Sequence, residues 1–211
     1  MKIAIIGTGR MAKAIGSVLS KVYPFEVGLY SRDIKRAKEV IEQLEIKAVA
    51  IPLQAVFSSE IIIHTLWYND ALEFVTNYSE QLKHKILVDI SNPFNEDFTD
   101  FVTDYDTSSA EEIQKRIPDT MVVGAFKNTY WVVFDTPEFG GIKSDIYVTG
   151  NDASSRKTVI DLLQPTPFRL FDAGSLKNNR TIERMTLLEK ELATKAGSHP
   201  RVAFHLWGVQ G

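Results

Sequence analysis

The chain has 211 residues, of which 44% are hydrophobic, and it carries a formal net charge of −3. This composition can bury one sizeable core, and the slightly acidic balance gives no field for holding a nucleic-acid backbone, so we expect no nucleic-acid partner. Because cysteine is absent, disulfides, thiolate metal ligands and a cysteine nucleophile are excluded. No apolar stretch reaches the roughly 18 residues typical of a membrane helix, and no secretory signal pattern is visible, so we predict a cytoplasmic protein without membrane contact.

The first half of the chain alternates short apolar runs with amphipathic stretches. The pattern predicts strands at residues 2–7, 25–31, 46–51, 59–67 and 85–91. It predicts helices at residues 11–22, 34–44 and 69–82. Strands that alternate with helices in this way form a parallel sheet with right-handed crossovers.

The second half begins with an acidic and aromatic stretch, residues 92–107, which is expected to be a long loop over the strand ends. A serine-capped helix at 108–117 then leads into a sixth strand at 121–127. Further strands are expected at 144–150 and 168–174, and further helices at 153–163 and 176–195. We interpret the charges of residues 183–195 as a solvated helix face.

A glycine-rich loop follows the first predicted strand. Residues 7–12, GTGRMA, fit the pattern G-x-G-x-x-G/A between an apolar strand and a helix, which is the context of a dinucleotide-binding loop. The first glycine allows the tight turn, the second lets a pyrophosphate approach the backbone, and the small last residue lets the helix lie close to the sheet. The predicted cofactor-binding residues of this loop are Gly7, Thr8, Gly9, Arg10, Met11 and Ala12.

The end of the second predicted strand indicates which dinucleotide binds. An NAD site keeps an acid there for the ribose 2′-hydroxyl, but this chain has the sequence LYSR at residues 29–32. Ser31, Arg32 and Arg36 can instead hydrogen-bond and neutralise a 2′-phosphate, so we predict NADP as the cofactor. The alternative is that both arginines are solvated residues at a helix start, and Asp33 beside them counts against a phosphate site.

Several stretches together resemble a known family. They are residues 7–12, YSR at 30–32, DISNPF at 89–94, VVGAFKNT at 122–129 and FDAGSLKNNRTIE at 171–183. The chain resembles the coenzyme F-420-dependent NADP oxidoreductases and the related N-terminal domain of the STEAP ferric reductases. The resemblance implies that a dinucleotide lies along the strand ends, with its nicotinamide next to a flavin-type ring, and that hydride passes between the two rings.

The resemblance also assigns expected roles to individual residues. Phosphate contacts are implied for Thr8, Arg10 and Met11, and 2′-phosphate contacts for Ser31, Arg32 and Arg36. Ribose or nicotinamide contacts are implied for Thr65, Leu66, Trp67, Asn92 and Ala125. A planar acceptor ring needs flat apolar walls, and we predict these from Trp67, Asn92, Phe126, His205 and Trp207. The alternative is that the two tryptophans are ordinary core residues.

The predicted fold class is α/β, a doubly wound Rossmann-type parallel sheet with a small C-terminal α/β extension. We expect an NADP-binding Rossmann domain at residues 1–137 and a small C-terminal α/β domain at 138–211 that closes the acceptor cleft. Residues 201–211 are aromatic and apolar, so they are expected to pack in a domain core or in a homodimer interface.

No obligatory catalytic side chain is predicted, because hydride transfer between rings depends on proximity and orientation. The four histidines show no metal-ligand spacing, so no metal site is expected. His64 lies in an apolar strand and is interpreted as a core residue, whereas a proton-donor role for His205 stays open. Asp172 either caps the helix that begins near Leu176 or binds in the cleft, and the default is that Ser175 caps this helix after a tight turn at Gly174. Residues 178–180 either point into the cleft or form an exposed helical turn.

The sequence therefore predicts an NADPH-dependent oxidoreductase that transfers hydride between NADP(H) and a flavin (FMN or FAD) or an F-420-type deazaflavin, with ferric reduction as a further acceptor chemistry. One alternative is an NADP(H)-binding redox sensor, although no effector module is visible. The other is a dehydrogenase of a small carbonyl or imine, which normally appends a large helical domain.

Overall fold

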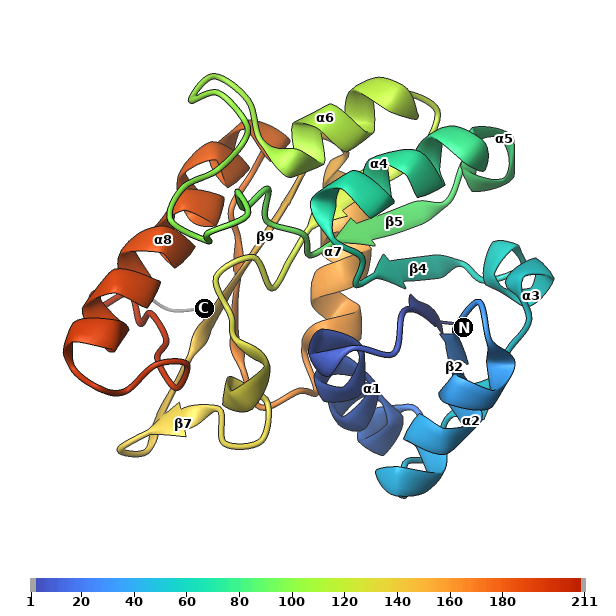
Figure 1. Ribbon diagram of the computed structural model, residues 1–211, viewed down its shortest axis with the longest axis horizontal. Coiled ribbons are helices and arrows are strands. Elements are labelled where there is room, and N and C mark those ends of the chain that lie inside the picture. Colours follow the sequence, from blue (N-terminus) through green and yellow to red (C-terminus); the bar gives the residue numbers. More distant parts are fainter. Residues whose placement is uncertain (1–2, 210–211) are drawn as a thin grey trace.

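The computed structural model describes residues 3–209, and Figure 1 shows a central sheet with helices on both of its faces. Eight strands form this sheet, and two more form a separate hairpin. The strands are β1 Ile3–Ile6, β2 Val27–Tyr30, β3 Val49–Ala50, β4 Ile61–His64, β5 Ile86–Asp89, β6 Met121–Gly124, β7 Glu138–Phe139, β8 Ile142–Lys143, β9 Asp145–Gly150 and β10 Arg169–Asp172.

Eight α-helices and two short 3₁₀ helices connect or follow the strands within residues 3–209. The helices are α1 Arg10–Val22, α2 Ile34–Gln43, α3 Leu53–Phe57, α4 Tyr68–Asn77, α5 Ser79–Leu82, α6 Ser109–Arg116, α7 Ala153–Leu163 and α8 Asn179–Lys195, with the 3₁₀ helices η1 Trp131–Val133 and η2 Leu176–Asn178. The structure shows no helix in this part of the chain that is long and apolar enough to cross a membrane.

The sheet has the order β10-β9-β6-β5-β4-β1-β2-β3. Strands β1 to β6 all run parallel to one another, β9 is antiparallel to β6, and β10 is parallel to β9. The order reverses at β1, which lies between β2 and β4, and doubly wound sheets bind ligands beyond the carboxyl ends of the strands at such a point. The predicted Rossmann-type α/β fold is confirmed.

Side-chain alternation along β1 shows how the two faces of the sheet are filled. Ile3 and Ile5 face one hydrophobic core, which α1, α2 and α7 cover, while Ala4 and Ile6 face a second core, which α3, α4 and α6 cover. All four side chains are at most 3% exposed. A strand buried on both faces reads as a continuous apolar run, which is why IAII gave a strong strand signal.

Three elements differ from the sequence prediction. β3 has only two residues, because Pro52 lacks the N–H that a longer ladder would need, and the following connector forms α3. The helix predicted over residues 69–82 is broken at Tyr78, whose backbone (φ −121°) leaves the helical region between α4 and α5. The short β7–β8 hairpin was not predicted at all.

The C-terminal segment is fastened to the far edge of the same sheet. Arg169 of β10 donates from Nε and Nη2 to the two carboxylate oxygens of Asp145 in β9, at 2.7 and 2.8 Å. The same guanidinium donates to the carbonyls of Leu206 and Val209, and Asp145 also accepts from the Leu206 N–H at 2.6 Å. Because β9 and β10 extend the sheet of the N-terminal part, both parts share one sheet, and the domain boundary at residue 137 stays a prediction.

We expect Arg169→Met to lower the free energy of unfolding by about 2–4 kcal/mol, because it leaves the fully buried Asp145 carboxylate without its cation. Lys157→Met is the matched control: it breaks an exposed ion pair with Asp161, and such pairs contribute about 0–1 kcal/mol. Denaturant midpoints of the two variants test this. Equal losses in both would show that the Arg169–Asp145 pair does not hold the C-terminal segment.

Candidate functional site

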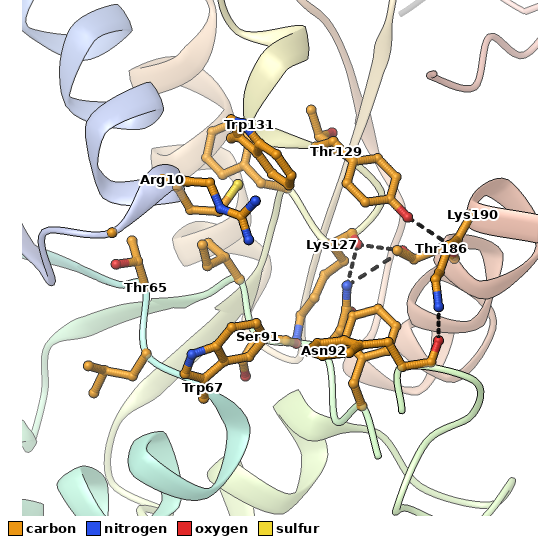
Figure 2. Close-up of a pocket in the computed structure, with 18 of the residues that line it drawn as sticks. Arg10, Thr65, Trp67, Ser91, Asn92, Lys127, Thr129, Trp131, Thr186 and Lys190 are labelled. Carbon is orange, nitrogen blue, oxygen red and sulfur yellow. Dashed lines mark hydrogen bonds between the residues drawn. The ribbon is translucent and has the colours of Figure 1, made fainter. Parts of the chain in front are cut away.

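A cavity of about 450 Å³ lies beyond the carboxyl ends of β4, β5 and β6, beside the start of α1 (Figure 2). Its volume is within the range of roughly 300–1,000 Å³ that small-molecule sites occupy. The lining residues come from the glycine loop, the loops after β4, β5 and β6, helix α8 and the segment after it. They are Gly9, Arg10, Met11, Thr65, Leu66, Trp67, Ile90, Ser91, Asn92, Phe94, Asp97, Phe98, Phe126, Lys127, Thr129, Tyr130, Trp131, Thr186, Lys190 and His199.

The two glycines of the loop have different physical roles. Gly7 has a φ of +120°, and a Cβ there would lie 2.3 Å from Thr65 Oγ1, which itself donates to the Ile6 carbonyl at 2.8 Å. The fold therefore needs a glycine at position 7. At Gly9 the backbone is ordinary (φ −76°), and a Cβ would have no neighbour within 4 Å. The protein's own packing does not require a glycine at position 9, so the open space there fits a pyrophosphate brought close to the backbone.

The residues predicted to read the 2′-phosphate lie at the end of β2 and the start of α2. Ser31 is half-buried, and Arg32 and Arg36 are exposed. Asp33 caps α2, and its carboxylate accepts from the Lys35 N–H at 3.0 Å. Asp33, the acid that counted against a phosphate site in the sequence, therefore acts as the N-cap of α2.

A buried ammonium group forms the floor of the cavity. Lys127, which follows β6, donates from Nζ to Asp89 at 2.5 Å, to the Ser91 carbonyl at 2.5 Å and to Glu183 of α8 at 2.8 Å. The side chains of the three charged residues are at most 1% exposed. The three N–H groups of the ammonium are all used, so Lys127 ties β5, β6 and α8 together.

Charge distribution in this cluster is uneven. Burial raises the pKa of Asp89, but the Lys127 ammonium and His64, whose Nε2 lies 3.0 Å from Asp89 Oδ1, together hold that pKa well below its usual range. Burial raises the pKa of Glu183, and the Lys127 ammonium offsets this only in part, while the nearby Asp89 charge adds to it. Burial lowers the pKa of Lys127, and its two carboxylate partners outweigh that effect and raise it. The Lys127–Asp89 pair is therefore ionised.

The backbone of Lys127 orients a second polar group. Its carbonyl accepts from Asn92 Nδ2 at 2.7 Å and from Thr186 Oγ1 at 2.7 Å. Because the amide nitrogen of Asn92 is held in this way, its Oδ1 is left buried without a hydrogen-bond partner. Asn92 lines the cavity, so this oxygen is an acceptor available to a ligand.

Aromatic rings form the cavity mouth. Trp67, which is 60% exposed, lies 5.8 Å from Phe98 between ring centroids, and Phe98 lies 5.5 Å from Phe94. On the opposite side the Arg10 guanidinium lies 3.8 Å from the ring centroid of Trp131. Phe98 and Phe126 both have a φ of +56°, a left-handed conformation that is strained for a bulky residue. Such strain concentrates at ligand sites.

Helix α8 buries a polar face against the sheet. Asn179, Glu183, Thr186 and Glu189 are all at most 4% exposed, whereas Leu188 and Leu192 are about half exposed. The interpretation of residues 183–195 as a solvated charged face is therefore wrong for these two glutamates. Both carboxylate oxygens of Glu189 lack a hydrogen-bond partner, and burial raises its pKa to about 9.

The structure brings eight of the seventeen predicted cofactor and acceptor residues to one cavity. Gly9, Arg10, Met11, Thr65, Leu66, Trp67, Asn92 and Phe126 line the cavity. Gly7, Thr8, Ala12 and Ala125 do not line it but lie within two residues of lining residues in the chain, and Ala12 and Ala125 are fully buried. His64 lies beneath the floor, as the core reading of that residue predicted.

Other predicted residues lie elsewhere. His205 and Trp207 do not line the cavity: His205 Nδ1 lies 3.0 Å from the Lys143 carbonyl, and Trp207 is 72% exposed against the His205 ring. The cause is the Arg169–Asp145 pair, which draws this segment to β9 and β10. Asp172 accepts from the Gly174 N–H and pairs with Arg156, and Gly174 has a positive φ, as the expected tight turn requires. The expected cap is absent, because the Ser175 side chain makes no capping hydrogen bond. Arg180 pairs with Glu111 of α6.

Sequence reasoning missed much of the lining. Lys127, Thr129, Tyr130, Trp131, Thr186, Lys190 and His199 all line the cavity but were not among the candidates. Residues 122–129 were singled out for their resemblance, yet only two of them were chosen. Thr186 is a polar residue on the buried side of α8. Because polar residues are mostly exposed, a buried one is a signal that could have pointed to this part of the site.

A Rossmann-type sheet with a glycine loop beside a cavity at the strand ends defines the class of NAD(P)-dependent oxidoreductases. Residues 2–93 match the family model described as "NADP oxidoreductase coenzyme F420-dependent". The chain is also 33% identical over 202 residues to the F420-dependent NADP reductase of Methanocaldococcus jannaschii, covering 89% of this chain and 90% of that protein. The chain belongs to this family of NADP-dependent oxidoreductases.

Two further similarities agree with this assignment. The chain is 27% identical over 187 residues to the metalloreductase STEAP3 of Rattus norvegicus, covering 88% of this chain but 36% of that protein. A crystal structure of a protein from Arthrobacter sp. fb24, with a suggested F420-dependent NADP reductase activity, has a TM-score of 0.83 at 23% identity and covers 94% and 96% of the two chains. This second similarity shows a shared fold.

We expect Glu189→Gln to flatten the pH dependence of stability between about pH 5 and pH 9. The folded wild type keeps the Glu189 proton up to about pH 9, whereas the unfolded chain releases it near pH 4.3. The free energy of unfolding should therefore fall as the pH rises through this window, and the amide removes that component. Urea midpoints at several pH values measure it.

Glu191→Gln is the matched control on the same helix, because Glu191 is exposed and pairs with Lys195. It should leave the slope between pH 6 and pH 9 unchanged. Parallel stability profiles for wild type and Glu189→Gln would contradict a buried, protonated Glu189.

Proposed function

We propose that this protein is an NADPH-dependent reductase of a flavin or F420-type deazaflavin ring. The observation that carries the proposal is the cavity at the strand ends, which has the glycine loop on one side and aromatic rings at its mouth. A planar ring bound between these walls would lie beside the part of the cavity that Thr65, Leu66 and Asn92 line. Hydride transfer requires the two rings to be in contact, and one shared cavity provides this.

The dinucleotide is proposed to follow the loop and the ends of the strands. Its pyrophosphate would approach the open backbone at Gly9, with Thr8, Arg10 and Met11 at the N-terminus of α1, where free N–H groups and the helix dipole favour an anion. Ser31, Arg32 and Arg36 would bind the 2′-phosphate. The exposure of both arginines and the use of Asp33 as a helix cap support this assignment.

The nicotinamide is proposed to lie near Thr65, Leu66 and Asn92, with Ala125 contributing backbone beneath it. The unpartnered Asn92 Oδ1 supplies a fixed acceptor for an N–H of either ring. Trp67, Asn92 and Phe126 remain the proposed acceptor contacts, while the positions of His205 and Trp207 give these two residues no support as acceptor contacts.

The protein's part in the reaction is positioning. The nicotinamide supplies the hydride when NADPH is bound, and the ring it meets supplies the acceptor carbon. Among the described side chains that line the cavity, Lys127 is fully engaged by its three acceptors, and Thr186 is engaged by the Lys127 carbonyl. The lining therefore fixes the geometry and excludes water, and we assign no residue a catalytic role.

An NADPH-oxidation assay with FMN, FAD, a 5-deazaflavin and a ferric chelate in parallel tests the proposed function. We expect turnover with at least one tricyclic ring acceptor, because the aromatic side chains at the cavity can stack on a planar ring. A small imine and a small carbonyl compound are added as further acceptors, and turnover with these alone would favour a dehydrogenase. NADPH binding without turnover of any acceptor would favour a redox sensor.

We expect NADPH to bind at least about tenfold more tightly than NADH, since one charge-assisted contact to the 2′-phosphate contributes roughly 1.5–3 kcal/mol. Arg32→Ala should weaken NADPH binding and leave NADH binding nearly unchanged. Lys38→Ala, which removes an exposed cation of α2 six residues after Arg32, is the control. Titration of both coenzymes measures the effect, and equal affinities in the wild type would rule out the 2′-phosphate assignment.

The homodimer and the cytoplasmic location stay predictions. Leu206, Trp207 and Val209 are 46–72% exposed in the described chain, which is consistent with the expected interface at the C-terminal segment. Sedimentation velocity would decide the oligomeric state.

A further inference from the structure

The cavity lining carries positive charge that the protein does not neutralise. Among the described residues that line it, the cations are Arg10, Lys127 and Lys190, and the one carboxylate is Asp97, which is exposed. Lys127 is paired with two buried carboxylates. Arg10 and Lys190 have no ion-pair partner within residues 3–209, and Figure 2 shows them on opposite sides of the cavity.

Lys190 is held in place although it has no counter-ion. It lies on α8 one turn beyond Thr186, which lines the same cavity, and it is half-buried. Its ammonium donates to the carbonyl of Phe98 and lies 6.0 Å from the centroid of that ring. An ammonium has three donors, so at least two remain for a ligand or for water.

The nearest acids along the chain do not cancel this charge. Glu189 is buried and protonated at neutral pH, since burial raises its pKa to about 9. Glu191 pairs with Lys195 on the exposed side of α8, at 2.5 Å. Asp100, in the loop that Lys190 contacts, pairs with Arg184 at 3.2 Å. Lys190 therefore stands at the aromatic cavity mouth without an ion pair to any carboxylate of residues 3–209, and the exposed Asp97 is the one carboxylate that lines the cavity with it.

We propose that Lys190 determines specificity by selecting acceptors that carry an anionic substituent, such as a phosphate on the side chain of the ring. This inference rests on the proposed function, because it takes the acceptor to be a flavin-type ring in this cavity. Arg10 lies in the glycine loop, on the dinucleotide side, and Lys190 lies across the cavity from it on α8. Arg10 would thus bind the pyrophosphate of the dinucleotide, and Lys190 would bind the anionic substituent of the acceptor.

The aromatic walls alone cannot distinguish a phosphorylated from an unphosphorylated ring compound. Stacking against Trp67, Phe98 and Trp131 depends on the ring, which a phosphorylated and an unphosphorylated flavin share. A fixed ammonium in a partly desolvated mouth adds a charge-assisted contact that only the phosphorylated form can make. Specificity is a difference between two affinities, so this one contact is enough to create it.

FMN and riboflavin form the test pair, because they differ only in the phosphate. With the wild type we expect a lower Michaelis constant, and a lower dissociation constant by fluorescence quenching, for FMN than for riboflavin. Lys190→Met should raise both constants for FMN about tenfold, the equivalent of one charge-assisted contact, and leave those for riboflavin within about twofold. 5-Deazariboflavin and its 5′-phosphate repeat the comparison on a deazaflavin ring.

Two control variants separate charge from structure. Lys190→Arg keeps the cation and should retain most of the preference for FMN. Lys195→Met removes an exposed cation from the same helix and should leave all constants unchanged. NADPH affinity should be the same in every variant, because the proposed pyrophosphate site is at the glycine loop beside Arg10, across the cavity from Lys190, and none of the residues proposed for the 2′-phosphate lines the cavity. Added salt should reduce the wild-type preference.

Equal losses for FMN and riboflavin in Lys190→Met would overturn the proposal and leave Lys190 as a support for the loop at Phe98. No preference in the wild type, or no binding of either flavin, would also overturn it. Riboflavin turnover with no phosphate preference would overturn the Lys190 proposal alone and leave the proposed function standing. Conversely, a phosphate-dependent binding preference without any turnover would support Lys190 and contradict the proposed function.

Discussion

The buried ammonium of Lys127 is the group on which the arrangement of the site depends. Three acceptors surround it: Asp89 at the end of β5, the carbonyl of Ser91 two residues further, and Glu183 of α8. A buried charge without partners is strongly unfavourable, so the strand ends and the helix must come together for any of these groups to be buried. Helix α8 follows Lys127 by more than fifty residues, and this contact fixes it over the sheet.

The position of the cavity follows from the same contact. The Lys127 carbonyl holds Asn92 from the β5 loop and Thr186 from α8, so the floor and one wall share an anchor. Two further cations connect α8 to the loop of residues 92–107: Arg184 donates to Asp100 and to the Thr103 carbonyl, and Lys190 donates to the Phe98 carbonyl. The loop that carries the aromatic rings of the cavity mouth is thereby hydrogen-bonded to α8. A displacement of α8 at the cavity floor would therefore also displace these rings.

Local patterns predicted the parts of this fold that local physics decides. Buried parallel strands are continuous apolar runs, and β1, β4 and β5 were read correctly on that basis. The glycine loop was likewise found from its spacing. The helix at α8 was also predicted, but its buried side was not. That side carries Glu183 and Glu189, whereas Leu188 lies on the exposed side. A sequence pattern cannot show that a lysine in the loop after β6 forms an ion pair with one glutamate, or that burial keeps the other protonated.

The sequence also placed His205 and Trp207 at the cavity, which they do not line. The reason is again a contact between residues that are distant in the chain. An aromatic run near the chain end can reach the cleft or the sheet edge with equal local propensity. A bidentate ion pair between Arg169 and the buried Asp145 carboxylate holds the segment at the sheet edge, because the same carboxylate also accepts from the Leu206 N–H. Long-range charge pairs of this kind, between Arg169 and Asp145 as between Lys127 and Glu183, decide which segments meet at the cavity. Hydrophobic periodicity decides only which segments form the sheet beneath it.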